Sequence, residues 1–261
     1  MKRTILALCF VICFLSAGVA PGSQDADMVT DETKQKIEVD TRFAGERIYF
    51  FGTIPDPEAD IIVKLISKHN DPTKLTRKGK VVLFWMSTKQ FEIRNVPYIY
   101  KIHSSKPLGE FLTPELVRAH KLDYETLKEG MDISLIKGDP SPDDKEVVFE
   151  GYVKMKENEN LYRIAENRIR ITKGRLFEHY FTFPDKAEEG RYVIESYAIK
   201  GGEVIAESND IVEVKKVGLM GWLYRTSQQN GLLYGAIAVA IALGAGLLVG
   251  RLFKGGGIDG Q

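Results

Sequence analysis

Four histidines are the side chains best suited to bind a metal or to move a proton, and they lie far apart in the sequence. They are His69, His103, His120 and His179. Histidine ligands of zinc commonly come from one helical turn, and no two of these residues have that spacing. The spacing therefore favours structural or surface roles for them and predicts no metal site.

A short acidic loop is the second candidate for metal binding. Asp56, Glu58 and Asp60 occupy alternate positions in a proline-containing segment, and their carboxylates could gather around a calcium ion. Calcium takes roughly 6 to 8 oxygen ligands, which is more than this loop offers. We therefore favour a solvated acidic loop between two strands.

The sequence His103-Ser104-Ser105 places a base beside two hydroxyl groups. Adjacent residues of a strand project to opposite faces, so the hydrogen bond that would activate a serine is difficult to form. A strand that enters a loop explains these residues better. No other motif indicates a reaction, and we expect a protein that is not an enzyme, with no catalytic residue and no cofactor.

A group of aromatic residues could line a groove for a ligand or a partner protein. Its members are Tyr98, Tyr100, Phe177, Tyr180, Phe181 and Phe183. Large aromatic side chains in β-type runs more often fill the core between two sheets. Most of this group is therefore expected to be core.

Short runs of β-forming residues, bounded by Gly, Pro, Asn or Asp, must position these side chains. The first predicted strands cover residues 47–52, 61–67, 80–86 and 91–102, the last of them broken by Pro97. The second group covers residues 168–172, 176–183, 191–199 and 204–214, with a Gly201-Gly202 turn before the last strand. This spacing predicts a mainly β fold, an immunoglobulin-like β-sandwich.

Two helical insertions are predicted between these groups of strands. Thr113-Pro114 can cap and begin the first, at about residues 113–128. Asp144 favours the start of the second, at about residues 144–158, because negative charge stabilises a helix N-terminus. The β-rich domain is expected to run over residues 23–225, as two lobes that share one unit.

The N-terminus has the pattern of a secretory signal peptide. Two basic residues precede an uncharged run, residues 4–20, which ends in small residues and a proline. We assign residues 1–22 to the signal, and cleavage after Gly18, Ala20 or Gly22 stays open. An uncleaved anchor helix is the alternative, and either outcome places the following domain outside the membrane.

Both cysteines of the chain, Cys9 and Cys13, lie in this uncharged run. The domain that follows is therefore expected to contain neither a disulfide nor a thiolate metal site. Apolar rather than small residues precede Cys13, which disfavours a lipid-attachment site there.

The C-terminal segment predicts one transmembrane helix, over residues 228–253. It contains no charged residue before Arg251, and a helix that is apolar on every side favours lipid over water. Trp222 and Tyr224 precede the span as expected interfacial anchors, and Arg251 and Lys254 are the expected anchors at its C-terminal end.

These charges predict the orientation in the membrane. Basic residues that follow a span are retained in the cytoplasm, which places the tail, residues 254–261, inside the cell. We expect a single-pass protein of the bacterial inner membrane with its N-terminal domain in the periplasm, although a domain at the cell exterior stays open. The formal net charge of the chain is zero, so nucleic acid is not an expected partner.

Two glycine pairs in the span have the spacing that lets transmembrane helices approach closely. They are Gly231 with Gly235 and Gly246 with Gly250. The pairs predict contact with the lipid bilayer on most sides and with another helix on one side. The second helix would belong to another integral membrane protein, such as a transporter, or to a second copy of this chain.

Several stretches of the chain, in order, resemble a known family. They are Phe43-Ala44-Gly45, Phe51-Gly52, Asn95-Val96-Pro97-Tyr98-Ile99-Tyr100, Ser104-Ser105-Lys106-Pro107-Leu108, Arg175-Leu176-Phe177, Lys216-Val217-Gly218-Leu219 and Leu233-Tyr234-Gly235. The sequence resembles the alphaproteobacterial-type transmembrane protein family, Alph_Pro_TM. The resemblance implies a signal peptide, a β-rich exported domain and a C-terminal span. It implies no activity and no catalytic residue, and residues 139–167 depart from the family pattern.

The leading hypothesis is a non-enzymatic envelope module that contacts another membrane protein, such as a transporter. The absence of a catalytic motif and the span able to pack against other helices motivate it. The alternative is an envelope sensor or binding protein for a small ligand or ion. An enzyme whose site is assembled from distant residues is the third and weakest hypothesis.

Overall fold

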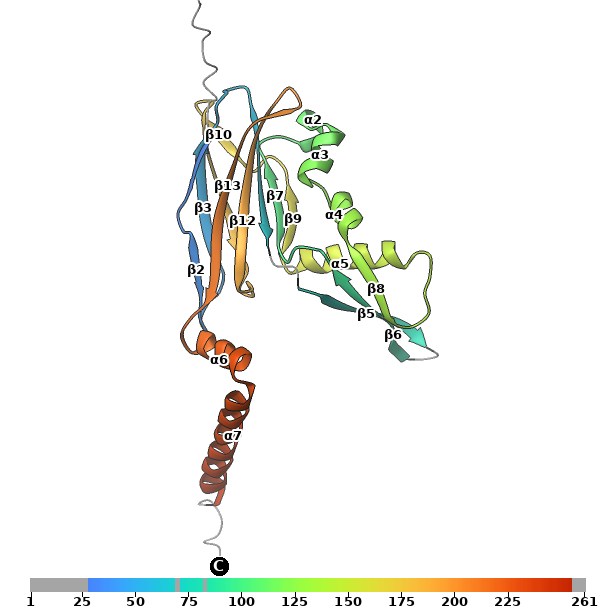
Figure 1. Cartoon of the computed structure of the whole chain (residues 1–261), viewed down its shortest axis with the longest axis vertical. Coiled ribbons are helices and arrows are strands. Elements are labelled where there is room, and N and C mark those ends of the chain that lie inside the picture. The colour runs from blue at the N-terminus through green and yellow to red at the C-terminus, as the bar shows by residue number, and fades with distance from the viewer. Residues whose placement is uncertain (1–27, 69–70, 82–83, 255–261) are drawn as a thin grey trace, which may run out of the picture.

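The structure, a computed structural model, describes residues 28–68, 71–81 and 84–254 (Figure 1). The expected signal peptide, with Cys9 and Cys13, lies outside these residues, as do His69 and the tail after Lys254. The described part contains more strand than helix. The predicted mainly β fold class is thereby confirmed.

One face of the domain is a four-stranded sheet in which all neighbours are antiparallel. Its strand order is β1 (Val29–Glu32), β3 (Glu46–Thr53), β11 (Leu176–Phe183) and β10 (Arg170–Thr172). Burial alternates along β3: Ile48 and Phe50 are fully buried, whereas Tyr49 and Phe51 are exposed. This period of two gives the sheet one core face and one outer face.

The opposite layer is a six-stranded sheet. Its order is β2 (Lys36–Val39), β13 (Glu203–Lys216), β12 (Gly190–Lys200), β4 (Asp60–Ser67), β7 (Tyr100–Ser104) and β9 (Tyr162–Ala165). The two outermost pairs, β2 with β13 and β7 with β9, are parallel. Gly201 and Gly202 form the turn between β12 and β13, with φ angles of 62° and 83° that favour glycine.

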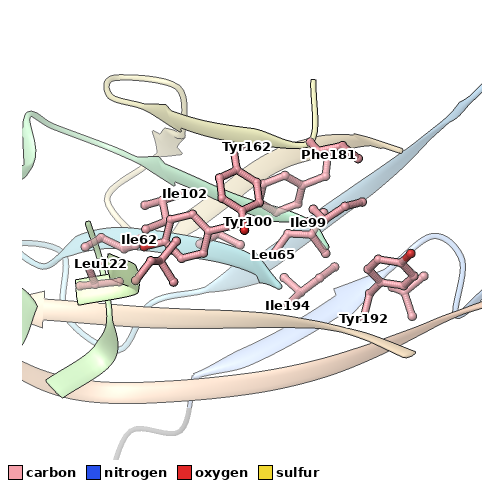
Figure 2. Close-up of a cluster of buried hydrophobic side chains, with 14 of the residues drawn as sticks. Ile62, Leu65, Ile99, Tyr100, Ile102, Leu122, Tyr162, Phe181, Tyr192 and Ile194 are labelled. Atoms are coloured by element: carbon pink, nitrogen blue, oxygen red, sulfur yellow. The ribbon is translucent and has the colours of Figure 1, made fainter. Parts of the chain in front are cut away.

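A large part of the core lies between these two sheets. The rings of Phe183 on β11 and Tyr192 on β12 are 5.2 Å apart, which joins the inner faces of the two layers. Figure 2 shows buried side chains of both sheets in one cluster, among them Phe181 of the smaller sheet and Leu65 and Ile194 of the larger one. The two-layer arrangement is compatible with the expected immunoglobulin-like sandwich.

A separate three-stranded sheet projects from the sandwich (Figure 1). It consists of β5 (Thr73–Val81), β6 (Phe84–Arg94) and β8 (Asp132–Lys137), all antiparallel. The prediction of a single strand at residues 80–86 is wrong, because these residues straddle the end of β5 and the start of β6. The apolar run continues across this point without Gly, Pro, Asn or Asp to indicate a turn.

Helices cover the outer face of the six-stranded sheet (Figure 1). They are α2 (Leu108–Phe111), α3 (Pro114–His120), α4 (Tyr124–Gly130) and α5 (Asp144–Asn158). The Thr113 side chain accepts a hydrogen bond from Leu116 N at 3.3 Å and so caps α3. The Tyr100 hydroxyl of β7 donates to Lys121 O at 2.7 Å, which fixes the end of α3 on the sheet.

Two helices end the described chain, α6 (Gly218–Gln229) and α7 (Gly231–Lys254). Trp222 and Tyr224 lie within α6, a helix that was not expected from the sequence. The apolar part of α7 is Gly231–Arg251, with a mean hydropathy of 2.4, and none of it is buried against the described chain. By length and composition, α7 is able to cross a membrane. Figure 1 shows it extending away from the sandwich beyond α6.

Candidate functional site

A cavity of about 190 Å3 lies between the two sheets where β7, β9 and β11 meet. Most of the residues that line it can carry a positive charge or donate a hydrogen bond. They are Lys101, His103, Asn160, Arg163, Arg168, His179, Tyr180 and Thr182. None of these described residues is acidic.

Strand alternation turns Lys101 and His103 of β7 toward the cavity. Tyr100 faces the helices, as its hydrogen bond to Lys121 shows, so the next residue, Lys101, faces the opposite sheet. His103 follows two residues later on the same side. Arg163 of β9 is the register partner of Lys101 and therefore lies on the same face.

Lys101 is the most buried charged group of the cavity, with only 3% of its surface exposed. Its Nζ donates a hydrogen bond to Thr182 O on β11 at 2.7 Å. Burial, and secondarily the nearby charge of Arg163, lowers the pKa of Lys101 to about 8. Lys101 is thus still mostly protonated at pH 7, in a place where its charge is poorly solvated.

His103 and His179 meet between the two sheets. Nδ1 of His103 contacts Nε2 of His179, their rings are nearly perpendicular with centroids 4.5 Å apart, and His103 stacks on Phe181. Burial is the largest cause that lowers the pKa of His103 to about 3 and that of His179 to about 4. Both rings are therefore neutral at pH 7.

The hydrogen bonds of this pair identify its tautomers. The backbone of Arg168 is a hydrogen-bond partner that raises the pKa of His179, so the His179 ring donates to it. Because its Nε2 meets His103, the donor is Nδ1, and His103 Nδ1–H then donates to His179 Nε2. The remaining nitrogen, His103 Nε2, is buried and has no hydrogen-bond partner in the described structure.

The exposed residues of the site lie at its entrance. Arg163 on β9 and Arg168 in the loop before β10 are both exposed. Their charges act on His103, since each contributes to lowering its pKa. The cavity thus combines two solvated guanidinium groups, one buried ammonium group and two neutral imidazoles, which is the composition of a site for an anion.

The carboxylates of the acidic loop pair with lysines. Asp56 and Glu58 both pair with Lys200, at 2.5 and 3.0 Å, whereas Asp60 pairs with Lys106 at 3.1 Å. The three carboxylates therefore have two different lysines as partners and do not converge on one point. No group of three or more His, Cys, Asp or Glu residues in the described ranges could hold a metal ion.

The two serines beside His103 bond elsewhere. Ser104 Oγ donates to Lys106 O at 2.5 Å, and Ser105 Oγ donates to Asp60 at 3.2 Å. The hydroxyl–imidazole hydrogen bond of a nucleophilic site is not formed by these residues. His120 packs edge-on against Tyr197, with ring centroids 4.5 Å apart.

Most of the expected aromatic group belongs to the core. Tyr100, Phe177, Phe181 and Phe183 are fully buried. Tyr180 instead lies on the outer face of its sheet with 43% of its surface exposed, and it borders the cavity. The structure thus separates one tyrosine from a group that sequence reasoning treated together.

Lys101, Arg163 and Arg168 were not identified from the sequence. One signal was available, because Lys101 interrupts the apolar run Ile99-Tyr100-Lys101-Ile102 inside a predicted strand. No local signal connects it to Arg163 or Arg168. The parallel pairing of β7 with β9 brings them together.

The predicted membrane-helix residues lie along α7 and beside it. A Cβ atom added at Gly231, Gly235, Gly246 or Gly250 would meet no described heavy atom within 4 Å. Arg251 ends the apolar window, and Lys254 is the last residue of α7. On α6, Trp222 and Tyr224 are exposed, and Lys216 Nζ lies 4.1 Å from the centre of the Tyr224 ring.

Comparisons with known proteins identify a family. No curated protein and no solved structure matches the chain. The model of the family named "Putative transmembrane protein (Alph_Pro_TM)" matches residues 27–255, which include all three sheets and both C-terminal helices. The chain therefore belongs to the Alph_Pro_TM family, and α7 is the one helix of its described part with the length and composition of a membrane span.

Proposed function

We propose that this protein is a non-enzymatic accessory module of the bacterial inner membrane that serves another membrane protein, such as a transporter. The observation that supports this most is the open surface of α7, none of which is buried against the described chain. A helix that is apolar on all sides buries its surface in lipid or against other transmembrane helices.

One side of α7 is suited to a helix partner. At about 100° per residue, Gly231, Gly235, Gly246 and Gly250 fall within an arc of roughly 100°. Small residues at such spacing let two backbones approach closely. Gly244 lies on the opposite side of α7.

The orientation follows from the charges at the ends of the chain. Arg251 and Lys254 follow the span, which favours a cytoplasmic C-terminus, and the basic start of the expected signal peptide favours export of the β-domain. The β-domain would then face the periplasm. There it would be free to contact the outer part of a partner protein.

The outer face of the four-stranded sheet offers a surface for that contact. Tyr49 and Tyr180 are register partners whose ring centroids are 5.6 Å apart, and Arg47 lies 5.2 Å from the centre of the Tyr180 ring. Phe51 and Leu176 are exposed on the same face. Tyrosine, phenylalanine and arginine are enriched at protein interfaces.

Leucine substitutions on α7 test this proposal. Gly246→Leu with Gly250→Leu is expected to abolish co-purification of a partner membrane protein in mild detergent, because the larger side chains separate the two backbones. Gly244→Leu with Ala240→Leu adds nearly the same volume away from the glycine pairs, and this control is expected to retain the partner. If the wild-type chain purifies alone under several growth conditions, the accessory role is wrong.

The cavity supports a second candidate function, an envelope sensor or binding protein for a small ligand or ion. Lys101, Arg163 and Arg168 gather positive charge around a space whose lining, in the described part of the chain, contains no acidic residue. Binding there would not require a partner protein. A thermal-shift screen of small anions and cations with the purified chain separates this candidate from the accessory role.

A further inference from the structure

Lys101 is buried, and no carboxylate of the described residues supplies the counter-charge that buried lysines normally have. Removing an ammonium group from water costs several kcal/mol unless a carboxylate or several hydrogen bonds replace the solvent. Thr182 O supplies one acceptor, whereas the Nζ group has three donors. Part of the hydrogen-bonding capacity of Lys101 is thus available to a ligand in the cavity that it lines.

The charge of the site has one sign. Among the described residues, the charged groups that act on His103 are all positive: Lys101, Arg163 and Arg168 each lower its pKa. Such a concentration of cations repels itself unless an anion lies among them. The two exposed guanidinium groups are suited to an oxyanion, because their planar arrays of N–H donors match two oxygens at once.

His103 adds a requirement for a proton donor. Its ring is neutral at pH 7, and its Nδ1–H donates to His179, so the buried Nε2 is an acceptor only. Nε2 has no partner in the described structure, and leaving a buried acceptor unpaired is unfavourable. A ligand that fits both this acceptor and the surrounding cations must carry a negative charge and a hydrogen-bond donor.

We infer that the cavity between β7, β9 and β11 binds a small oxyanion that carries a proton, of which hydrogen phosphate is the simplest example. Lys101, Arg163 and Arg168 bind its negative oxygens, and His103 Nε2 accepts its proton-bearing hydroxyl. A cavity of about 190 Å3 has room for such an ion. This inference rests on the second candidate function and is independent of the accessory role of α7.

Calorimetric titration of the full-length chain in mild detergent tests the inference. The buffer is free of phosphate and sulfate, with chloride at constant ionic strength, and the titrants are inorganic phosphate and sulfate at pH 7. Phosphate is expected to bind at one saturable site. Sulfate is expected to bind about tenfold more weakly, because it has no proton to donate to the unpaired nitrogen.

Three variants connect binding to the cavity. Lys101→Met is expected to weaken phosphate binding at least about tenfold, since a charge-assisted hydrogen bond is lost. Arg163→Gln and Arg168→Gln change exposed side chains, so they fold even if Lys101→Met does not, and each is expected to weaken binding several-fold. Arg170→Gln removes a nearby charge that does not line the cavity and is the matched control.

The outcomes are distinct. Absence of saturable phosphate binding, or unchanged affinity in both arginine variants, would overturn the anion site. Equal affinities for sulfate and phosphate would overturn the requirement for a proton on the ligand. Co-purification of a membrane partner is measured separately, and the cavity variants are expected to leave it unchanged, so failure of one proposal does not imply failure of the other.

Discussion

Lys64 and Lys101 lie on adjacent strands of the same sheet and are almost equally buried, at 4% and 3% exposure. Lys64 Nζ is 2.5 Å from Glu195 Oε2 and also donates to His120 O at 2.5 Å, on the helix-covered face. Lys101 faces the other way, into the sandwich, and its one described partner is Thr182 O. Among the described residues, one buried lysine thus has a carboxylate partner and the other does not.

The difference separates a structural lysine from a ligand-binding one. Burial lowers the pKa of both lysines, but for Lys64 the Glu195 carboxylate opposes the effect, whereas for Lys101 the nearby Arg163 adds to it. The helix-covered face is therefore electrostatically complete without a ligand. The cavity face is incomplete, and an anion would complete it.

Acidification is expected to have the largest effect, and it acts on the cavity face. The pKa values of His103 and His179 are lowered to about 3 and about 4 in the fold, with Lys101, Arg163 and Arg168 as the charged groups that surround them. Below pH 6.5 the unfolded chain takes up protons that the folded chain does not, so the free energy of unfolding falls. At pH 5 the loss is about 2 kcal/mol for each histidine.

Urea titrations of the full-length chain in mild detergent between pH 7 and pH 5 measure this loss. The double variant His103→Gln with His179→Gln is expected to flatten the pH dependence in this window. His120→Gln, a histidine outside the cavity, serves as the control and is expected to retain the wild-type slope. A slope that persists in the double variant would show that other groups destabilise the fold in acid.

Removal of the carboxylate on the helix-covered face is expected to have the next largest effect. Glu195→Gln leaves Lys64 buried without its counter-ion and should lower the free energy of unfolding by about 3 kcal/mol at pH 7. Glu207→Gln, at an exposed position on β13, is the control and should change it by less than about 0.5 kcal/mol. A loss below about 1 kcal/mol in Glu195→Gln would show that Lys64 does not depend on this pair.

The elements with strong local signals were predictable from the sequence. β11 has the predicted bounds, residues 176–183, because alternating aromatic residues end at Pro184. α5 has the predicted bounds as well, residues 144–158. β8 and β9 were missed because short strands at sheet edges carry little periodicity, and their existence depends on pairing with distant partners.

The cavity could not be predicted for the same reason. Lys101 and His103 come from β7, Arg163 from β9 and His179 from β11, so two different strand pairings and the packing of two sheets are needed to bring them together. The four histidines are well separated in the sequence, and spacing alone gave no reason to pair two of them. Convergence of this kind depends on register and topology, which single-sequence patterns do not specify.

Lys101→Met is expected to have the smallest effect on stability, and its sign is opposite to that of Glu195→Gln. Lys101→Met removes a buried charge that has no carboxylate and keeps most of the apolar stem, so in anion-free buffer it should raise the free energy of unfolding by about 1 kcal/mol at pH 7. Loss of the hydrogen bond to Thr182 O limits the gain.

Phosphate should then stabilise the wild-type chain but not the variant, because a ligand stabilises only the state that binds it. Paired urea titrations with and without phosphate measure both quantities. A variant that loses about 2 kcal/mol or more in anion-free buffer would instead make Lys101 a structural residue like Lys64, since the fold would then depend on its charge without any ligand present.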